Sequence, residues 1–182
     1  MTSSGLHSTL AATAALLIAI ILLRAAWHKL RDVESFAALA ADYRLLPAWA
    51  VGGAARVLIV LEAGSALALI VPRLAPVGAG IAVAMLLIYA VAMATNILRG
   101  RKQLDCGCGG EPQGLGWTLV VRNLLLTAIA VLALEPHEIP RSAGEWALAA
   151  AAGLTLWIGF LLAEQLLANA SRMAWAIGEK GS

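Results

Sequence analysis

The chain has 182 residues, of which 61% are hydrophobic and only 13% charged, and its formal net charge is +2. Soluble globular domains are about 45–50% apolar and about 25% charged, so this composition excludes an ordinary water-facing surface and predicts a lipid bilayer as the surroundings. The basic residues form no dense run interleaved with aromatic residues, which argues against nucleic acid as a partner. The length fits a single membrane domain covering residues 1–182.

Five segments of the sequence meet the requirement of about 20 mostly apolar residues for a membrane-spanning helix. No Lys or Arg precedes the first apolar run and no cleavage site follows it, so we expect a retained span rather than a signal peptide. The sequence therefore predicts an all-α, polytopic membrane helical bundle. The predicted spans cover approximately residues 8–29, 52–71, 74–98, 115–134 and 145–165.

Two of the connections between these spans are long enough to carry features of their own. Residues 32–46 are polar but place Phe36, Leu39 and Tyr43 at helical spacing, which predicts an amphipathic helix at the membrane interface. Residues 99–116 form a glycine-rich loop. Within the spans, we expect small residues to let the helices pack closely; the glycines singled out are Gly64, Gly78 and Gly80.

Basic residues are distributed unevenly between the two faces that the five spans define. The positive-inside rule assigns the face that is richer in Lys and Arg to the cytoplasm. Taken alone, the count therefore places the loop 99–116 in the cytoplasm and the N-terminus outside. The richer face carries Lys29, Arg31, Arg44, Arg99, Arg101, Lys102, Arg172 and Lys180, and the other face carries Arg73 and Arg141.

The only two cysteines, Cys106 and Cys108, lie one residue apart in this loop, in the segment Asp105-Cys106-Gly107-Cys108-Gly109-Gly110. This spacing differs from the Cys-x-x-Cys of common metal sites, and the three histidines are widely scattered, so no metal site is predicted. A disulfide between such close residues is strained and readily reduced. Nearby basic residues and the helix that follows favour the thiolate. We expect thiol chemistry here; the alternative is two unreactive loop thiols.

Glu62 is the second feature, because it lies near the middle of the second span, where an ionisable side chain is costly and usually faces a partner. Arg24, at similar depth in the first span, is the first candidate partner, with Arg56 and Lys29 as shallower alternatives; a protonated Glu62 without a partner is a further alternative, since burial raises the pKa of a carboxyl group. The pair either fixes helix register or takes part in function. Lys29 is also expected near the cysteine loop, where its charge would favour a thiolate; the alternative role is anchoring at the interface.

These residues resemble the MauE family of methylamine utilisation proteins, within the wider group of DoxX-like membrane proteins. The resemblance covers about residues 18–134, and Gly109 stands where the family segment has a phenylalanine. It implies a four-helix core like that of vitamin K epoxide reductase-type proteins, with a fifth, C-terminal span. The matching motifs are Arg24-x-x-x-x-Lys29, the stretch from Phe36 to Tyr43-Arg44-Leu45-Leu46-Pro47, Glu62-Ala63-Gly64 and the segment from Asp105 to Gly110.

The resemblance implies a multi-pass inner-membrane protein that assists processing, export or disulfide formation of the methylamine dehydrogenase small subunit or a similar periplasmic client. Cys106 and Cys108 would then be the catalytic pair of a thiol–disulfide oxidoreductase, with a quinone as electron partner and a thioredoxin-like protein as a further partner. This role requires the loop outside the cytoplasm, where disulfides persist, and so conflicts with the charge count. The supporting residues are Asp105, Lys29, Arg24 and Glu62.

Two other functions are compatible with the sequence. In the first, the chain is a non-enzymatic membrane subunit or chaperone that holds a partner, and activity depends on packing glycines such as Gly64 rather than on the cysteines. In the second, it is a small transporter that uses Glu62 as a proton or cation site. The lack of a discontinuous helix pair in the sequence weakens the transporter interpretation.

Overall fold

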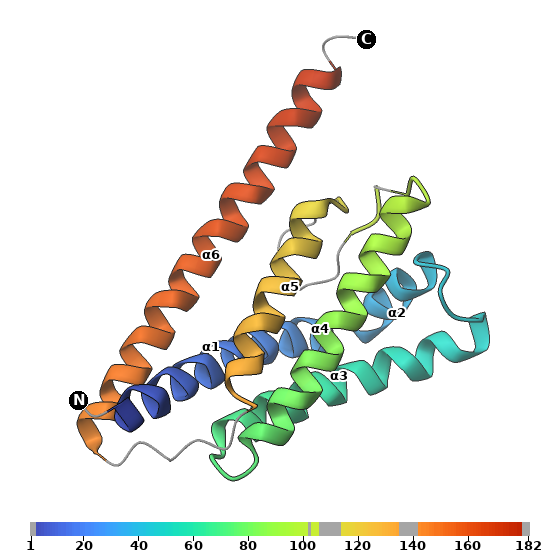
Figure 1. Cartoon of the computed structure of the whole chain (residues 1–182). Helices are drawn as coiled ribbons and strands as arrows, with labels where there is room; N and C mark the ends of the chain where they lie inside the picture. The colour runs from blue at the N-terminus through green and yellow to red at the C-terminus, as the bar shows by residue number, and fades with distance from the viewer. Residues whose placement is uncertain (1–2, 102, 106–113, 135–141, 180–182) are drawn as a thin grey trace.

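The computed structural model describes residues 3–101, 103–105, 114–134 and 142–179, and in these ranges the chain is helical apart from short turns and connections. Figure 1 shows the helices in chain order, with the N-terminus, the α3–α4 turn and the start of α6 at one end of the bundle. The end of α4, the start of α5 and the C-terminus lie at the other end. The helices are α1 (Ser3–Arg31), α2 (Val33–Asp42), α3 (Ala48–Ile70), α4 (Ala75–Leu98), α5 (Trp117–Leu132) and α6 (Ala143–Glu179).

This arrangement confirms the predicted fold class, an all-α polytopic membrane bundle. Four helices of the described chain, α1, α3, α4 and α6, are long and apolar enough to cross a bilayer. Helix α5 has only 16 residues and is shorter than the span predicted over 115–134. Its apolar character suits a membrane interior, but it is about one turn shorter than a helix that crosses at right angles needs to be. A complete crossing by this segment stays a prediction.

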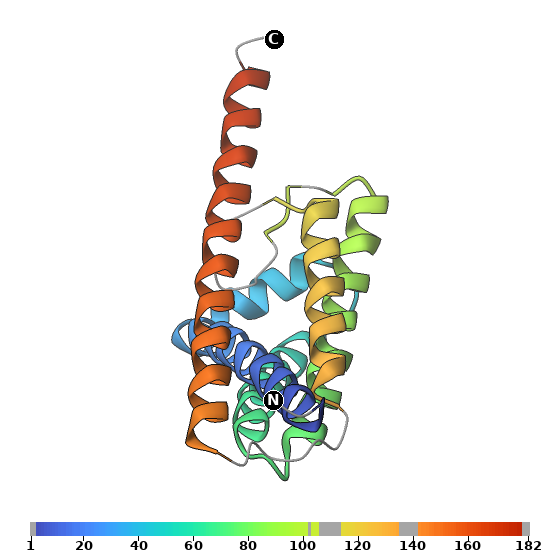
Figure 2. The same cartoon turned by 60° about the vertical axis from the view of Figure 1, so that its left-hand side comes forward.

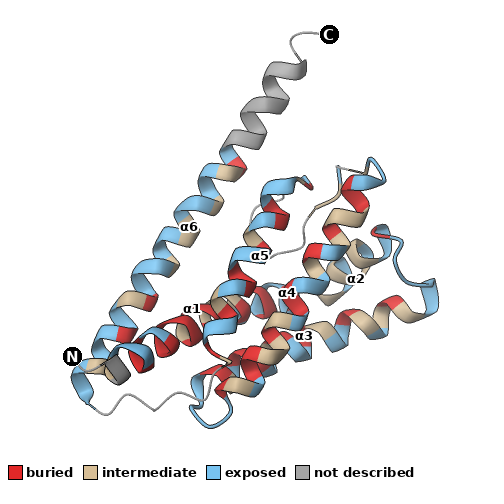
Figure 3. Ribbon diagram, viewed as in Figure 1, coloured by how far each residue is buried: buried red, intermediate tan, exposed pale blue. Residues whose placement is uncertain are grey.

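The core of the bundle lies where α1, α3, α4 and α5 face one another, as the buried positions in Figure 3 show. Small residues predominate in it, so that the helix axes approach closely. The backbone of α6 lies close only to that of α1 among the described helices (Figure 2), and most of the described residues of α6 are exposed (Figure 3). The central cluster is formed by Ala15, Ile18, Ala19, Leu22, Ala66, Leu69, Ala79, Ala82, Leu86, Leu126, Ala130 and Ala133.

Helix α2 lies within the segment 32–46 where a helix was predicted and contains no buried residue, and its location at the membrane interface stays a prediction. It begins after Asp32, whose carboxylate accepts hydrogen bonds from the hydroxyl of Ser35 at 2.6 Å and from its backbone N–H at 2.9 Å. These bonds lower the pKa of the Asp32 carboxyl below its ordinary value. The cap is therefore charged at neutral pH, and its stabilising effect is lost only as the pH falls through the lowered pKa.

The glycines of the spans have different roles. A Cβ atom on Gly78 would lie 2.8 Å from the backbone nitrogen of Leu69 and 2.9 Å from the carbonyl oxygen of Ser65, so glycine is required for α4 to approach α3. The Ser65 hydroxyl donates to the Gly78 carbonyl at 2.7 Å across this contact. At Gly80 a Cβ would make an ordinary contact, and at Gly64 it would meet nothing within 4 Å. The expectation that Gly64 lets helices pack closely is therefore wrong for the part of the chain that the structure describes.

We predict that Gly78→Ala lowers the free energy of unfolding by about 1–3 kcal/mol, because the new methyl group forces α3 and α4 apart. Gly64→Ala is the matched control, and it should be neutral or stabilising by roughly 0.5–1 kcal/mol, since it only removes a flexible residue from a helix. Denaturant unfolding of the purified protein in detergent, followed by circular dichroism, measures both. Equal effects of the two substitutions would contradict the close contact at Gly78.

Candidate functional site

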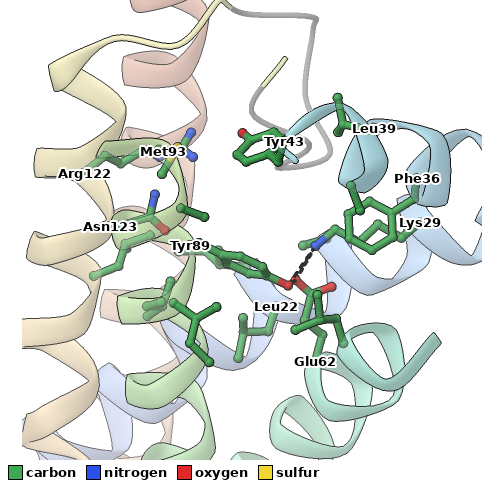
Figure 4. Close-up of a pocket in the computed structure, with 18 of the residues that line it drawn as sticks. Leu22, Lys29, Phe36, Leu39, Tyr43, Glu62, Tyr89, Met93, Arg122 and Asn123 are labelled. Atoms are coloured by element: carbon green, nitrogen blue, oxygen red, sulfur yellow. Dashed lines mark hydrogen bonds and ion pairs between the residues drawn. The ribbon is translucent and has the colours of Figure 1, made fainter. Parts of the chain in front are cut away.

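A buried ion pair joins α1 to α3 near the end of the bundle that carries α2. The Lys29 ammonium contacts the Glu62 carboxylate, and both side chains are almost fully buried, with 4% and 1% of their surface exposed. The Tyr89 hydroxyl from α4 donates to the same Glu62 oxygen at 2.7 Å and lies 3.4 Å from the Lys29 nitrogen. Figure 4 shows these side chains converging from three helices. The predicted partner of Glu62, Arg24, is wrong, and the alternative Lys29 is the one observed.

Aromatic rings surround the Lys29 ammonium. Its nitrogen lies 4.9 Å from the ring centre of Phe36 on α2 and 4.9 Å from that of Tyr89 on α4. A ring face attracts a cation electrostatically, and more strongly where water is excluded. Lys29 is thus held by one carboxylate and two rings from three different helices. Lys29 is therefore a buried and paired cation rather than an exposed one.

Glu62 carries one oxygen that the pair leaves unsatisfied. Lys29 and Tyr89 both donate hydrogen bonds to Oε1 of Glu62, whereas its buried Oε2 has no hydrogen-bond partner among the described residues. A buried polar atom without a partner costs free energy. Burial of the Glu62 carboxylate therefore destabilises the fold, and its attraction to the Lys29 ammonium offsets this cost.

Arg24 belongs to a second charged cluster and lies five residues before Lys29 on α1. Glu164 of α6 accepts from the Arg24 guanidinium at 2.8 Å through one oxygen and from the Arg122 guanidinium of α5 at 2.8 Å through the other. The Arg122 guanidinium also lies 6.0 Å from the centre of the Phe160 ring. The Glu164 carboxylate therefore links α6 to both α1 and α5.

A cavity of about 260 Å³ lies between these two clusters. Its wall is mostly apolar, with the Lys29–Glu62 pair on one side and the Arg24–Glu164–Arg122 cluster on another. Helix α2 closes it through Phe36, Leu39, Ala40 and Tyr43. Figure 4 shows Tyr43, Tyr89 and Asn123 around this space. The cavity can thus hold an apolar group beside a small number of charged and hydrogen-bonding side chains.

The segment that contains the cysteines is tied down at both of its ends. Helix α4 ends at Leu98, and Gly100, two residues further on, has a φ of +76° that suits glycine. Further on, Asp105 and Gly114 form an antiparallel bridge, and the Leu115 N–H donates to the Leu104 carbonyl at 3.1 Å. The Tyr43 hydroxyl donates to the Asp105 carbonyl at 3.0 Å. Cys106 and Cys108 themselves lie outside the described residues, between these two fixed ends.

The structure distributes the predicted supporting residues over two clusters and the loop. Lys29 and Glu62 come together, Arg24 joins a different carboxylate, and Asp105 contributes its backbone to the end of the cysteine segment. Sequence reasoning assigned no role to Tyr89, Arg122 or Glu164. Glu164 could have been singled out from the sequence, because it is a charged residue inside the predicted fifth span, as Glu62 is in the second.

Comparison with known proteins gives a consistent result. The family model described as methylamine utilisation protein MauE matches residues 7–135. The methylamine utilization protein MauE of Paracoccus denitrificans is 42% identical over 153 residues, covering 82% of each chain. That of Methylophilus methylotrophus is 36% identical over 163 residues, covering 87% of this chain and 86% of the relative. No solved structure matches the chain.

We predict that Lys29→Met and Glu62→Leu each lower the free energy of unfolding by about 3–5 kcal/mol, because each leaves the other charge buried without a partner. The double variant should lose much less than the sum of the two, since it leaves no buried charge at this position. Denaturant titration in detergent provides all three values.

Arg24→Gln is the matched control for this cycle. Its effect should be smaller, because Glu164 keeps Arg122 as a partner and the Arg24 side chain is 36% exposed. Additive losses in the Lys29→Met, Glu62→Leu double variant would show that the two side chains are not coupled and would refute the pair.

Proposed function

The chain belongs to the MauE family of methylamine utilisation proteins, and from this premise we propose that it is a thiol–disulfide redox protein of the inner membrane. Its client in this proposal is a periplasmic protein of methylamine utilisation, such as the small subunit of methylamine dehydrogenase. The observation that carries the proposal is that the cysteine segment is held on both sides. The Tyr43 hydroxyl binds the Asp105 carbonyl, and Asp105 forms a bridge with Gly114. The only two thiols of the chain lie between these contacts in the sequence, one residue apart.

The proposed reaction exchanges one disulfide for another. A client thiolate attacks one sulfur of the Cys106–Cys108 disulfide, and a mixed disulfide forms as the other cysteine leaves as a thiolate. A second client thiolate then attacks the mixed disulfide, so that the client becomes oxidised and the pair retains two electrons. An acceptor of two electrons regenerates the disulfide, and a membrane quinone or a disulfide of a thioredoxin-like partner has this chemistry.

Holding the ends of the segment favours such a cycle. A loop whose ends are fixed loses little further conformational entropy when its two thiols join, because part of the ordering cost has already been met. Arg101 lies in the same connection and is held by a 3.2 Å hydrogen bond to the Asn96 side-chain oxygen. Its positive charge stabilises thiolates in this loop. These features support a reactive pair rather than two inert thiols.

The other two functions have less support. A cation transporter needs an acidic side chain that is available to its substrate, whereas Glu62 is neutralised by Lys29 and bonded by Tyr89. The role of a non-enzymatic subunit was expected to depend on glycines such as Gly64, but a Cβ atom on this glycine would meet no atom of the described residues within 4 Å. An exposed glycine can still contact a helix of a partner protein. Substitution of the cysteines therefore distinguishes the non-enzymatic role from the redox function.

We predict that Cys106→Ser and Cys108→Ser, singly or together, reduce formation of disulfide-bonded methylamine dehydrogenase small subunit to the level of cells without the protein. Each removes one of the two sulfur atoms that the exchange requires. The measurement is the redox state of the small subunit on non-reducing gels, together with dehydrogenase activity in the same cells.

Gln113→Ser is the matched control, because it places a serine in the same loop and leaves both thiols in place. Immunoblots of isolated membranes establish that all variants are present in equal amounts. Full maturation of the client with the cysteine-free variant would rule out the redox proposal and favour the non-enzymatic subunit.

A further inference from the structure

The Glu62 carboxylate has a capacity for hydrogen bonding that the described residues leave unused. Its ion pair with Lys29 keeps it ionised, and an ionised carboxylate can only accept hydrogen bonds, through both of its oxygens. Lys29 and Tyr89 donate to Oε1, whereas the buried Oε2 has no hydrogen-bond partner among the described residues. Because the Glu62 side chain is almost fully buried, the group that would satisfy Oε2 is a hydrogen-bond donor inside the bundle.

This carboxylate borders the cavity of about 260 Å³ described above. Figure 4 shows Glu62 together with Tyr89 among the side chains that surround the space. A group bound in the cavity therefore lies beside the Glu62 carboxylate. Most of the remaining wall is apolar, and Leu22, Leu86 and Leu126 belong to it. The cavity thus offers a hydrogen-bond acceptor to a molecule whose other parts are apolar.

The cavity can be reached from the outside of the bundle. Leu45, Leu46 and Ile88 line it, and all three side chains are also exposed. A side chain that is exposed and lines a cavity borders both, so the cavity opens to the surface beside these residues. Ile88 lies on α4, one of the helices that are long and apolar enough to cross a bilayer. An apolar molecule dissolved in the lipid can therefore enter the cavity.

We propose that this cavity binds an uncharged, membrane-soluble alcohol or phenol whose hydroxyl group donates a hydrogen bond to Oε2 of Glu62. The apolar part of the molecule lies against the leucine side chains of the wall. Pockets for drug-sized ligands are roughly 300–1,000 Å³, so a cavity of about 260 Å³ takes a small molecule, such as a single ring with a short chain.

The surroundings of Oε2 favour an uncharged hydroxyl group over a charged head group. A cationic donor would be repelled by the Lys29 ammonium, which contacts the other oxygen of the same carboxylate, and an anionic group would be repelled by Glu62 itself. A hydroxyl group that donates to an ionised carboxylate forms a short and strong hydrogen bond. The proposal does not depend on the thiol chemistry, because none of these side chains belongs to the cysteine segment.

The test uses the full-length purified protein in uncharged detergent micelles and two matched pairs of photoactivatable probes. One pair is para-butylphenol and its methyl ether, and the other is octanol and its methyl ether, each with a diazirine in the alkyl chain. Each ether resembles its partner in shape but has no hydrogen to donate. Probe concentrations are expressed as mole fractions in the micelle, so that unequal partitioning does not affect the comparison.

We expect saturable labelling by at least one hydroxyl probe. Its half-saturation concentration should be about tenfold lower than that of the matched ether, because the ether leaves the buried Oε2 of Glu62 without a donor. A preference for the phenol or for the alcohol identifies which kind of hydroxyl compound the cavity takes.

Two pairs of variants locate the site. Ala92→Phe fills the cavity and should abolish saturable labelling, whereas Val91→Phe places the same ring at an exposed position of α4 and should leave it unchanged. In Glu62→Gln the amide oxygen stays with the Lys29 ammonium and the amide nitrogen, a donor, replaces Oε2, so the hydroxyl and ether probes should bind within about twofold of each other. Glu34→Gln, at an exposed position outside the cavity, should keep the preference for the hydroxyl probe.

The wild-type protein alone can overturn the proposal, so it does not depend on how the variants fold. Equal half-saturation within both pairs of probes, or labelling that never saturates, would refute it. Equal labelling of Ala92→Phe and Val91→Phe would place the bound probe elsewhere and would refute it as well. The Cys106→Ser, Cys108→Ser double variant should bind the hydroxyl probe as the wild type does, which separates this result from the fate of the redox proposal.

Discussion

The buried contact between Lys29 and Glu62 is the interaction on which the arrangement of this bundle depends. It joins α1 to α3, and Tyr89 brings α4 to the same carboxylate. Among apolar helices in lipid the hydrophobic effect gives little direction, whereas a buried charge pair is satisfied in only one register. Phe36 rests near the Lys29 ammonium and thereby positions α2, and Tyr43 at the end of α2 holds the Asp105 carbonyl. A continuous series of contacts thus runs from the core pair to the beginning of the cysteine segment.

The charge count and the proposed disulfide chemistry place the cysteine segment on opposite sides of the membrane. The end of α4 and the start of α5 lie at the same end of the bundle as the end of α6 (Figure 1), and the sequence count assigns most of the basic residues to this face. Part of the basic character has a local structural role. Lys29 forms an ion pair with Glu62, and Arg101 donates a hydrogen bond to the Asn96 side chain. Residues fixed in this way contribute less to a free positive surface than the sequence count implies, which weakens the argument from charge and leaves room for the periplasmic location that disulfide chemistry requires.

The fold class could be predicted from the sequence because the requirement for about 20 apolar residues per span is a local property. The short helix α2 was also predictable, since Phe36, Leu39 and Tyr43 recur at helical spacing. The basic residue that pairs with Glu62 could not be predicted in this way. Arg24 and Lys29 lie within one and a half turns of each other on α1, and only the rotation and tilt of α1 against α3 and α6 decide which of them meets Glu62. Likewise, Gly64 and Gly78 look equivalent as sequence, yet only Gly78 faces a backbone at close range. The site therefore depended on helix packing, which no single segment encodes.

The central claim is that the two thiols form a disulfide pair on the outer side of the inner membrane. Labelling of intact cells with a membrane-impermeant maleimide, with and without prior mild reduction, tests it most directly, because Cys106 and Cys108 are the only cysteines of the chain. The account predicts labelling of intact cells only after reduction. Labelling that appears only after the cells are lysed would place the loop in the cytoplasm and would contradict the proposed role in oxidative maturation.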